Sequence, residues 1–123
     1  MMLSFNKLGK SGRLGNQMFQ YAALRGIAAN HGFDWVIPPP EDGGIGDFGE
    51  ENNYCMFDTF NMVHATEEHL GIQDTKQWAV WKEFHFHQEL FDKCPDNTNL
   101  DGYFQSEKYF KNIEQEIRQD FEF

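Results

Sequence analysis

The segment of this sequence with the clearest chemical potential is a glycine-rich stretch near its start. Gly9, Gly12 and Gly15 recur at every third position, and Lys10 and Arg13 lie between them. Glycine lets the backbone approach a ligand closely, and a helix that begins directly after such a turn offers unpaired amide groups and the positive end of its dipole. The stretch therefore predicts a binding site for an anion such as a diphosphate, although a tight turn with solvated basic side chains fits the spacing equally well.

The two best-known phosphate-binding patterns do not account for this stretch. Its spacing is G-x-x-G-x-x-G, whereas the dinucleotide-binding fingerprint requires G-x-G-x-x-G. The string Gly9-Lys10-Ser11 ends like a P-loop, but Ser4 occupies the place of the leading glycine. The sequence thus supports neither a dinucleotide fingerprint nor a P-loop.

The residues around the glycine stretch are patterned as a βαβ unit. Leu3–Leu8 alternates apolar and polar side chains as a strand does, and Asn16 is placed to cap an apolar helix that ends near Gly32. Asp34–Ile37 then forms a short buried strand, which three prolines terminate. This order predicts two parallel strands with a right-handed crossover. The expected fold is α/β, a Rossmann-like three-layer domain with a short, mainly parallel sheet whose strand ends bind the ligand.

The remainder of the chain adds further elements without a chemical motif of its own. An acidic, glycine-rich loop is expected at residues 41–53 because it contains four glycines and five carboxylates. The other predicted elements are a short helix at 65–70, a strand at 78–86, a turn at 92–99, a last short strand at 100–104 and an amphipathic helix at 106–120.

Charge and length limit the functions that are open to the chain. Its 123 residues carry 20 acidic and 10 basic side chains, a formal charge of −10, and are expected to form one domain. Such a surface disfavours nucleic acid and anionic lipid, so we expect no nucleic-acid partner and at most a peripheral membrane association. The N-terminus lacks a signal-peptide pattern and Cys55 and Cys94 suit a reducing compartment, so a cytoplasmic location is expected.

Two contiguous blocks carry a resemblance to a known family. The run GRLGNQMFQYA, residues 12–22, is similar to the N-terminal signature of the glycosyltransferase family 11 α-1,2-fucosyltransferases. The run GYFQSEKYF, residues 102–110, resembles a second block of that family, and the two blocks occur in the family's order. An unrelated small α/β nucleotide-binding protein would share the glycine stretch but not the second block.

The resemblance implies a reaction and a set of site residues. It implies inverting transfer of L-fucose from GDP-fucose to the 2-hydroxyl of a galactose-type acceptor, on a GT-B-like pair of Rossmann-type domains and without an obligatory metal or other cofactor. The sequence contains no Asp-x-Asp string of the kind that holds a divalent cation in many other glycosyltransferases. The implied donor-binding loop consists of Gly12, Arg13, Gly15, Asn16 and Gln17, and the implied acceptor-side residues are Tyr103 and Gln105.

One part of the family pattern is missing from the printed sequence. None of the five histidines begins the His-x-Arg-Arg-x-Asp block of the family's guanine-nucleotide half. We therefore expect residues 1–123 to form the N-terminal, acceptor-side domain of a transferase, without the C-terminal GDP-fucose-binding domain and with little or no activity alone. A non-catalytic glycan-binding remnant of such an enzyme is the alternative.

The proton acceptor for the reaction cannot be chosen among 20 carboxylates. Glu83 and Glu107 are flanked by aromatic residues that could bury them and raise their pKa, but for each a surface acid is the commoner case. His85 and His87 would share one face of a strand, a geometry found in metal sites, yet no third ligand is in register. The catalytic residue therefore stays unassigned, and no metal site is predicted.

Overall fold

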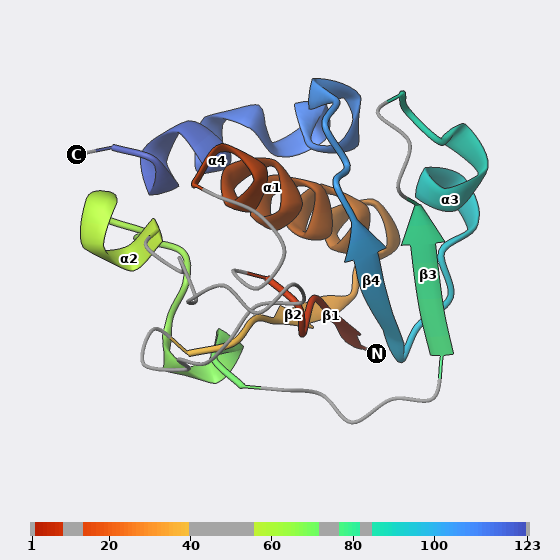
Figure 1. Cartoon of the computed structure of the whole chain (residues 1–123), viewed down its shortest axis with the longest axis horizontal. Coiled ribbons are helices and arrows are strands. Elements are labelled where there is room, and N and C mark those ends of the chain that lie inside the picture. The colour runs from red at the N-terminus through yellow and green to blue at the C-terminus, as the bar shows by residue number, and fades with distance from the viewer. Residues whose placement is uncertain (1, 9–13, 40–55, 72–76, 82–84, 123) are drawn as a thin grey trace, which may run out of the picture.

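The molecule is built around a parallel sheet of four strands. The computed structural model describes residues 2–8, 14–39, 56–71, 77–81 and 85–122 (Figure 1). The strands β1 (Met2–Ser4), β2 (Asp34–Val36), β3 (Gln77–Trp81) and β4 (Thr98–Gly102) lie in the order β2-β1-β4-β3. Every pair of neighbours is parallel. This confirms the predicted α/β class and the opening βαβ unit.

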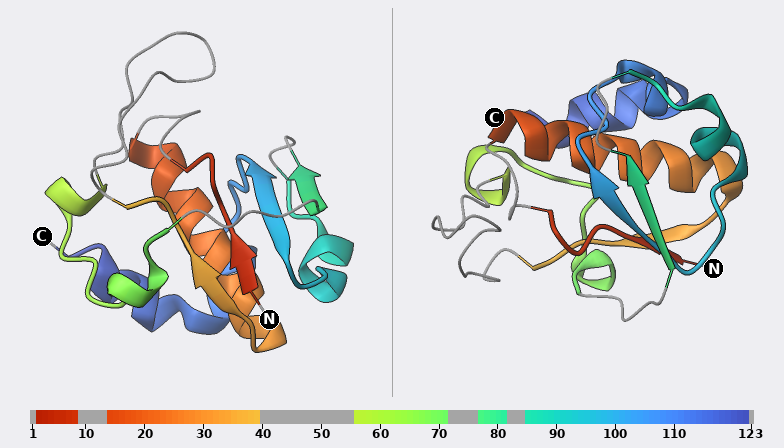
Figure 2. Two further views of the ribbon diagram at one scale, coloured as in Figure 1. Left: turned by 90° about the horizontal axis from the view of Figure 1, so that it is seen from below. Right: turned by 45° about the vertical axis from the view of Figure 1, so that its right-hand side comes forward.

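The long helix α1 (Leu14–His31) links β1 to β2 and is buried on almost every side. The views in Figures 1 and 2 place α1 between the sheet and the C-terminal helical segment. A helix that is covered on both sides needs an apolar surface all round, as its sequence has. Gly32, with φ of +68°, ends it in the left-handed conformation that glycine adopts easily. The expected cap at Asn16 is wrong, because the helix begins at Leu14 and Asn16 lies inside its first turn.

The second half of the chain departs from the predicted elements. The region expected as a turn at 92–99 contains the end of a helix, α3 (Gln88–Lys93), and the first two residues of β4. The expected helix at 65–70 is only a 3-10 turn, Glu67–His69, and a short helix α2 (Met56–Thr59) precedes it. The expected helix at 106–120 is divided into two 3-10 turns, Glu107–Tyr109 and Lys111–Ile113, and the helix α4 (Glu114–Asp120).

The core on the α1 side of the sheet is rich in aromatic rings. Tyr21 of α1 packs edge to face on Trp35 of β2, with ring centroids 5.6 Å apart. Phe104 packs in the same manner on Phe5 and on Tyr109. Such pairs stabilise a core beyond the area that they bury. Among the described residues, no helix has both the length and the apolar character needed to cross a membrane.

A buried ion pair fastens the C-terminal helix to α1. Arg25 Nη1 lies 2.6 Å from Asp120 Oδ2, and both side chains are almost wholly shielded from solvent. The Tyr21 hydroxyl donates to the same carboxylate, whose other oxygen accepts from the backbone amide of His64 at 2.7 Å. Burial raises the pKa of Tyr21, so its hydroxyl stays protonated and keeps donating. One carboxylate thus joins α1, α4 and the loop that follows α2.

Removing the carboxylate charge tests this joint. Asp120→Asn leaves the buried Arg25 with the half-exposed Glu116, at 2.9 Å, as its one remaining counter-ion in the described part of the chain. We expect a loss of about 3 kcal/mol in the free energy of unfolding, measured by urea denaturation. The control Glu114→Gln breaks the exposed pair with Arg118 and should cost less than about 0.5 kcal/mol. Equal losses in the two variants would show that the buried pair stabilises the fold no more than the exposed pair does.

A close backbone approach fixes the second sequence block against α1. A Cβ atom added to Gly26 would lie 1.8 Å from the backbone oxygen of Tyr109, whereas one added to Gly15 of the same helix would meet nothing within 4 Å. Only glycine therefore permits α1 and the 3-10 turn at 107–109 to pack this closely.

Alanine at these two glycines should have opposite effects. Gly26→Ala forces the two backbones apart and should lower the free energy of unfolding by about 2 kcal/mol or more. Gly15→Ala should leave it equal or raise it by up to about 1 kcal/mol, because alanine favours the helix. Urea denaturation of both variants makes the comparison, and a Gly26→Ala protein as stable as the original would contradict the close approach.

Candidate functional site

The structure brings the two sequence blocks together at the carboxyl end of the sheet. The Gln105 side-chain amide donates to Asn16 Oδ1, and Gln20 Nε2 donates to the backbone oxygen of Gly102 at 2.8 Å. Phe19 and Phe110, one from each block, have ring centroids 6.2 Å apart. Residues 14–22 of the first block and residues 102–110 meet because β1 pairs directly with β4, so the chain leaves both strands at the same edge.

The start of α1 presents the donor-loop residues in different ways. Gly15 is exposed, Asn16 is half-buried and Gln17 is fully buried. The side chain of Gln17 therefore supports the first turn from inside, while Gly15 and Asn16 remain accessible at the amino end of an 18-residue helix. The first-turn amides and the helix dipole make this end favourable for an anion. Gly12, Arg13 and Lys10 lie outside the described residues.

A bend after β4 directs the second block toward α1. Gly102 has φ of +148°, and its added Cβ would lie 1.8 Å from the backbone oxygen of Trp81. Phe104 has φ of +52°, a left-handed conformation that is uncommon for an aromatic residue. Strained backbone of this kind persists where the surroundings hold it, and it often marks functional sites. Tyr103 and Gln105, the predicted acceptor-side residues, flank Phe104 and are both half-buried.

A polar group that the sequence reading missed lies on β4 itself. Asn99 is fully buried, and its Oδ1 accepts from the Asn6 backbone amide at 2.9 Å and from Ser4 Oγ at 3.3 Å. Asp101, 7% exposed, pairs with Lys7 Nζ at 3.6 Å. A turn is expected at 92–99 and a strand at 100–104, so Asn99 falls outside the predicted strand, whereas Asp101 lies within it. The alternation of polar Asn99 and Asp101 with Leu100 is the signal that would have found them.

The two candidate proton acceptors gain no support. Glu107 is exposed at the start of its 3-10 turn, which agrees with the surface acid expected as the commoner case and not with a buried proton acceptor. Glu83 lies outside the described residues. In the same block, Tyr109 is buried, which raises its pKa, and its hydroxyl accepts from the backbone amide of His87 at 2.8 Å. Tyr109 is thus a structural contact between the second block and the segment before α3.

The paired histidines serve local structure. β3 ends at Trp81, so His85 and His87 do not share a strand face, and the expectation of a strand through residue 86 is wrong. His87 Nδ1 accepts from the amide of Leu90 at 2.8 Å and caps α3, while its ring packs on Trp81 with centroids 4.2 Å apart. Within the described ranges, no three histidine, cysteine, aspartate or glutamate side chains are grouped to hold a metal ion.

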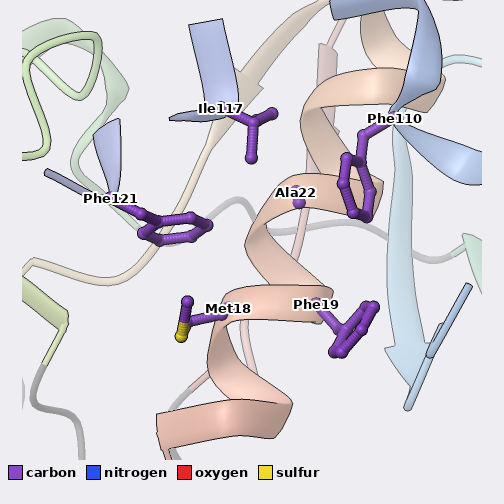
Figure 3. A pocket seen from close by; sticks show the side chains of 6 residues that line it. All are labelled: Met18, Phe19, Ala22, Phe110, Ile117 and Phe121. Atoms are coloured by element: carbon purple, nitrogen blue, oxygen red, sulfur yellow. The ribbon is translucent and has the colours of Figure 1, made fainter. Parts of the chain in front are cut away.

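An apolar groove of about 220 Å³ runs between α1 and the C-terminal segment (Figure 3). Three of its lining residues lie on α1 and three lie in the segment 110–121. They are Met18, Phe19, Ala22, Phe110, Ile117 and Phe121. None of these side chains can hydrogen-bond strongly to a sugar or a phosphate. This groove is therefore a poor site for a sugar nucleotide, unlike the polar edge at Asn16 and Gln105.

Comparisons of the chain with protein-family models, with curated proteins and with solved structures find no match.

The contact between the two blocks can be measured as a coupling energy. Asn16→Ala, Gln105→Ala and the double variant form a cycle in which the loss of the shared hydrogen bond is counted once. We expect a coupling of about 1 kcal/mol in the free energy of unfolding by urea denaturation. Strictly additive losses would mean that the two side chains do not touch in solution.

Proposed function

We propose that this chain is the acceptor-side part of an inverting α-1,2-fucosyltransferase that uses GDP-fucose and a galactoside and acts together with a nucleotide-binding domain of the GT-B kind. The observation that carries this proposal is the contact between residues 12–22 and 102–110, the two blocks that resemble the fucosyltransferases. Their side-chain amides, Asn16 and Gln105, hydrogen-bond across 89 positions of sequence. A chance likeness in two separate strings gives no reason for them to meet at a ligand-binding edge.

The departing GDP would be stabilised by the amino end of α1. Cleavage of the bond between fucose and the diphosphate leaves negative charge on the phosphate oxygens. Transition-state charge of this kind is stabilised by fixed donors and dipoles that need no rearrangement during the reaction. The first-turn amides of α1 supply such donors, and Lys10 and Arg13 of the preceding stretch supply positive charge.

Asn16 would orient the donor rather than neutralise it, and Gln105, the implied acceptor-side residue, would hold the Asn16 amide in place. The bond from Gln105 to Asn16 Oδ1 fixes the plane of the Asn16 amide at the start of the helix. A neutral, fixed amide can hydrogen-bond to the hydroxyls of the sugar. Because it carries no charge, it does not bind the diphosphate of the intact donor more tightly than it binds the transition state. We therefore assign both residues to positioning and leave the proton acceptor unassigned.

The second candidate is a glycan-binding protein that performs no transfer. The observation in its favour is the indole of Trp78, which is 50% exposed and offers a flat apolar surface to a sugar ring. The two candidates differ in a simple respect, since only a transferase has a reason to recognise GDP-fucose.

Titration of the 15N-labelled chain with GDP-fucose tests the proposed function. We expect weak binding, with a dissociation constant on the order of 1 mM, and NMR shifts concentrated on the Asn16 and Gln105 side-chain amides and the first turn of α1. Asn16→Ala should weaken it about 10-fold, whereas Gln115→Ala, which removes an exposed amide of α4, should not. Absence of shifts at the start of α1, or equal effects of the two variants, would refute the proposal and favour the glycan-binding candidate.

A further inference from the structure

The face of the sheet that points away from α1 carries buried polar side chains on β1 and β4 and exposed apolar side chains on β3. Residues that are paired in register project to the same face of a parallel sheet. Ser4, Asn99 and Trp78 are such partners, and Val80 is the partner of Asp101. The other face carries Leu3 and Trp35, which belong to the core with α1. Parallel sheets normally cover both faces with apolar side chains, so this polar face is a departure that needs a reason.

The exposed part of this face is a large apolar surface on β3. Trp78 is 50% exposed and Val80 is 56% exposed. An indole of this size that remains half in solvent is a common anchor for a ligand, because it offers a broad flat face and a hydrogen-bonding edge. Lys7 Nζ lies over the Trp78 ring, 5.8 Å from its centroid, so one face of the indole borders a charged group.

Hydrogen-bonding groups border the indole on β4 and on the segment after β1. Asp101 pairs with Lys7, so a carboxylate and an ammonium group lie next to each other beside the ring. The buried Asn99, register partner of Trp78, has both acceptor bonds of its Oδ1 satisfied, but its Nδ2 lacks a partner in the described part of the chain. A buried donor without a partner is uncommon and is the kind of group that a ligand hydroxyl can satisfy.

We propose that Trp78, Asp101, Lys7 and Asn99 form a binding site for a neutral saccharide on the sheet face opposite α1, at the exposed side of β3. A sugar ring has an apolar face of C–H groups, which suits the indole, and an edge of hydroxyls that both donate and accept. Asp101 accepts hydroxyl protons and Lys7 donates to hydroxyl oxygens, and their opposite charges cancel. A charged ligand would gain from one member of the pair and be repelled by the other. Saccharide binding at this face does not require the proposed function, but its assignment to the galactoside acceptor does.

The site is tested with lactose as the probe, by NMR titration of the 15N-labelled chain. We expect saturating shifts of the Trp78 indole N–H and of the β4 amides, with a dissociation constant on the order of 1 mM. Trp78→Ala should weaken binding about 10-fold, Trp78→Phe should retain part of it, and Asp101→Asn should also weaken it. Gln77→Ala is the matched control, because Gln77 is the exposed neighbour on the same strand but belongs to the opposite face.

The outcomes separate this inference from the proposed function. Lactose shifts at Trp78 without GDP-fucose shifts at Asn16 would support the saccharide site and reject the transferase. GDP-fucose shifts at Asn16 with no response of Trp78 to lactose would do the reverse. A lactose affinity that Trp78→Ala leaves unchanged would overturn the saccharide site. So would a dimer that sedimentation detects and Trp78→Ala dissociates, because a second copy would then cover the face.

Discussion

The parallel pairing of β1 with β4 is the constraint on which the rest of the structure depends. It joins the first residues of the chain to a strand almost 100 positions later, with Leu3 opposite Thr98 and Ser4 opposite Asn99. Because parallel strands end at one edge of a sheet, the chain turns into α1 and into the 102–110 block from neighbouring positions. The contacts of Gln105 with Asn16 and of Gln20 with Gly102 follow from this pairing. Without this strand pairing, the two blocks would not lie next to each other.

The C-terminal segment keeps this arrangement in place from the other side of α1. The Asp120 carboxylate accepts hydrogen bonds from the Arg25 guanidinium, the Tyr21 hydroxyl and the His64 backbone amide. Its hydrogen-bonding capacity is therefore met without solvent. Gly26 allows the backbone of Tyr109 to touch α1 directly. The amino end of α1 thus lies at the polar edge formed by Asn16 and Gln105. The middle of the same helix packs on the C-terminal segment. Moving the amino end of α1 relative to the sheet would disrupt the contacts at Asp120 and Gly26, so these contacts hold that end in place.

Sequence reasoning recovered the parts of the fold that are governed by local pattern. The strand, apolar helix and strand of residues 2–36 were predictable because Tyr21, Leu24 and Ile27 mark a buried helix and the prolines end the second strand. β4 was predicted only in part, as a strand at 100–104, because it carries the polar Asn99 and Asp101, whose burial depends on distant partners such as Ser4 and Lys7. The predicted last helix is interrupted at Phe110, whose ring packs on Phe19 of α1. The helical spacing of apolar residues in the sequence gives no sign of this contact. For the site, the resemblance supplied Asn16 and Gln105, whereas Trp78 and Asp101 emerged only from the register of the sheet.

Two surfaces of the molecule are proposed to bind ligands. We propose that a leaving diphosphate binds at the amino end of α1 and that a neutral sugar binds on the sheet face opposite α1. A crystal structure of the chain soaked with GDP-fucose is the most direct measurement of the central claim. The account predicts the diphosphate at the first-turn amides of α1, with the fucose ring against Asn16 and Gln105. A nucleotide bound in the apolar groove at Phe19 and Phe121, or anywhere that leaves both amides untouched, would contradict it.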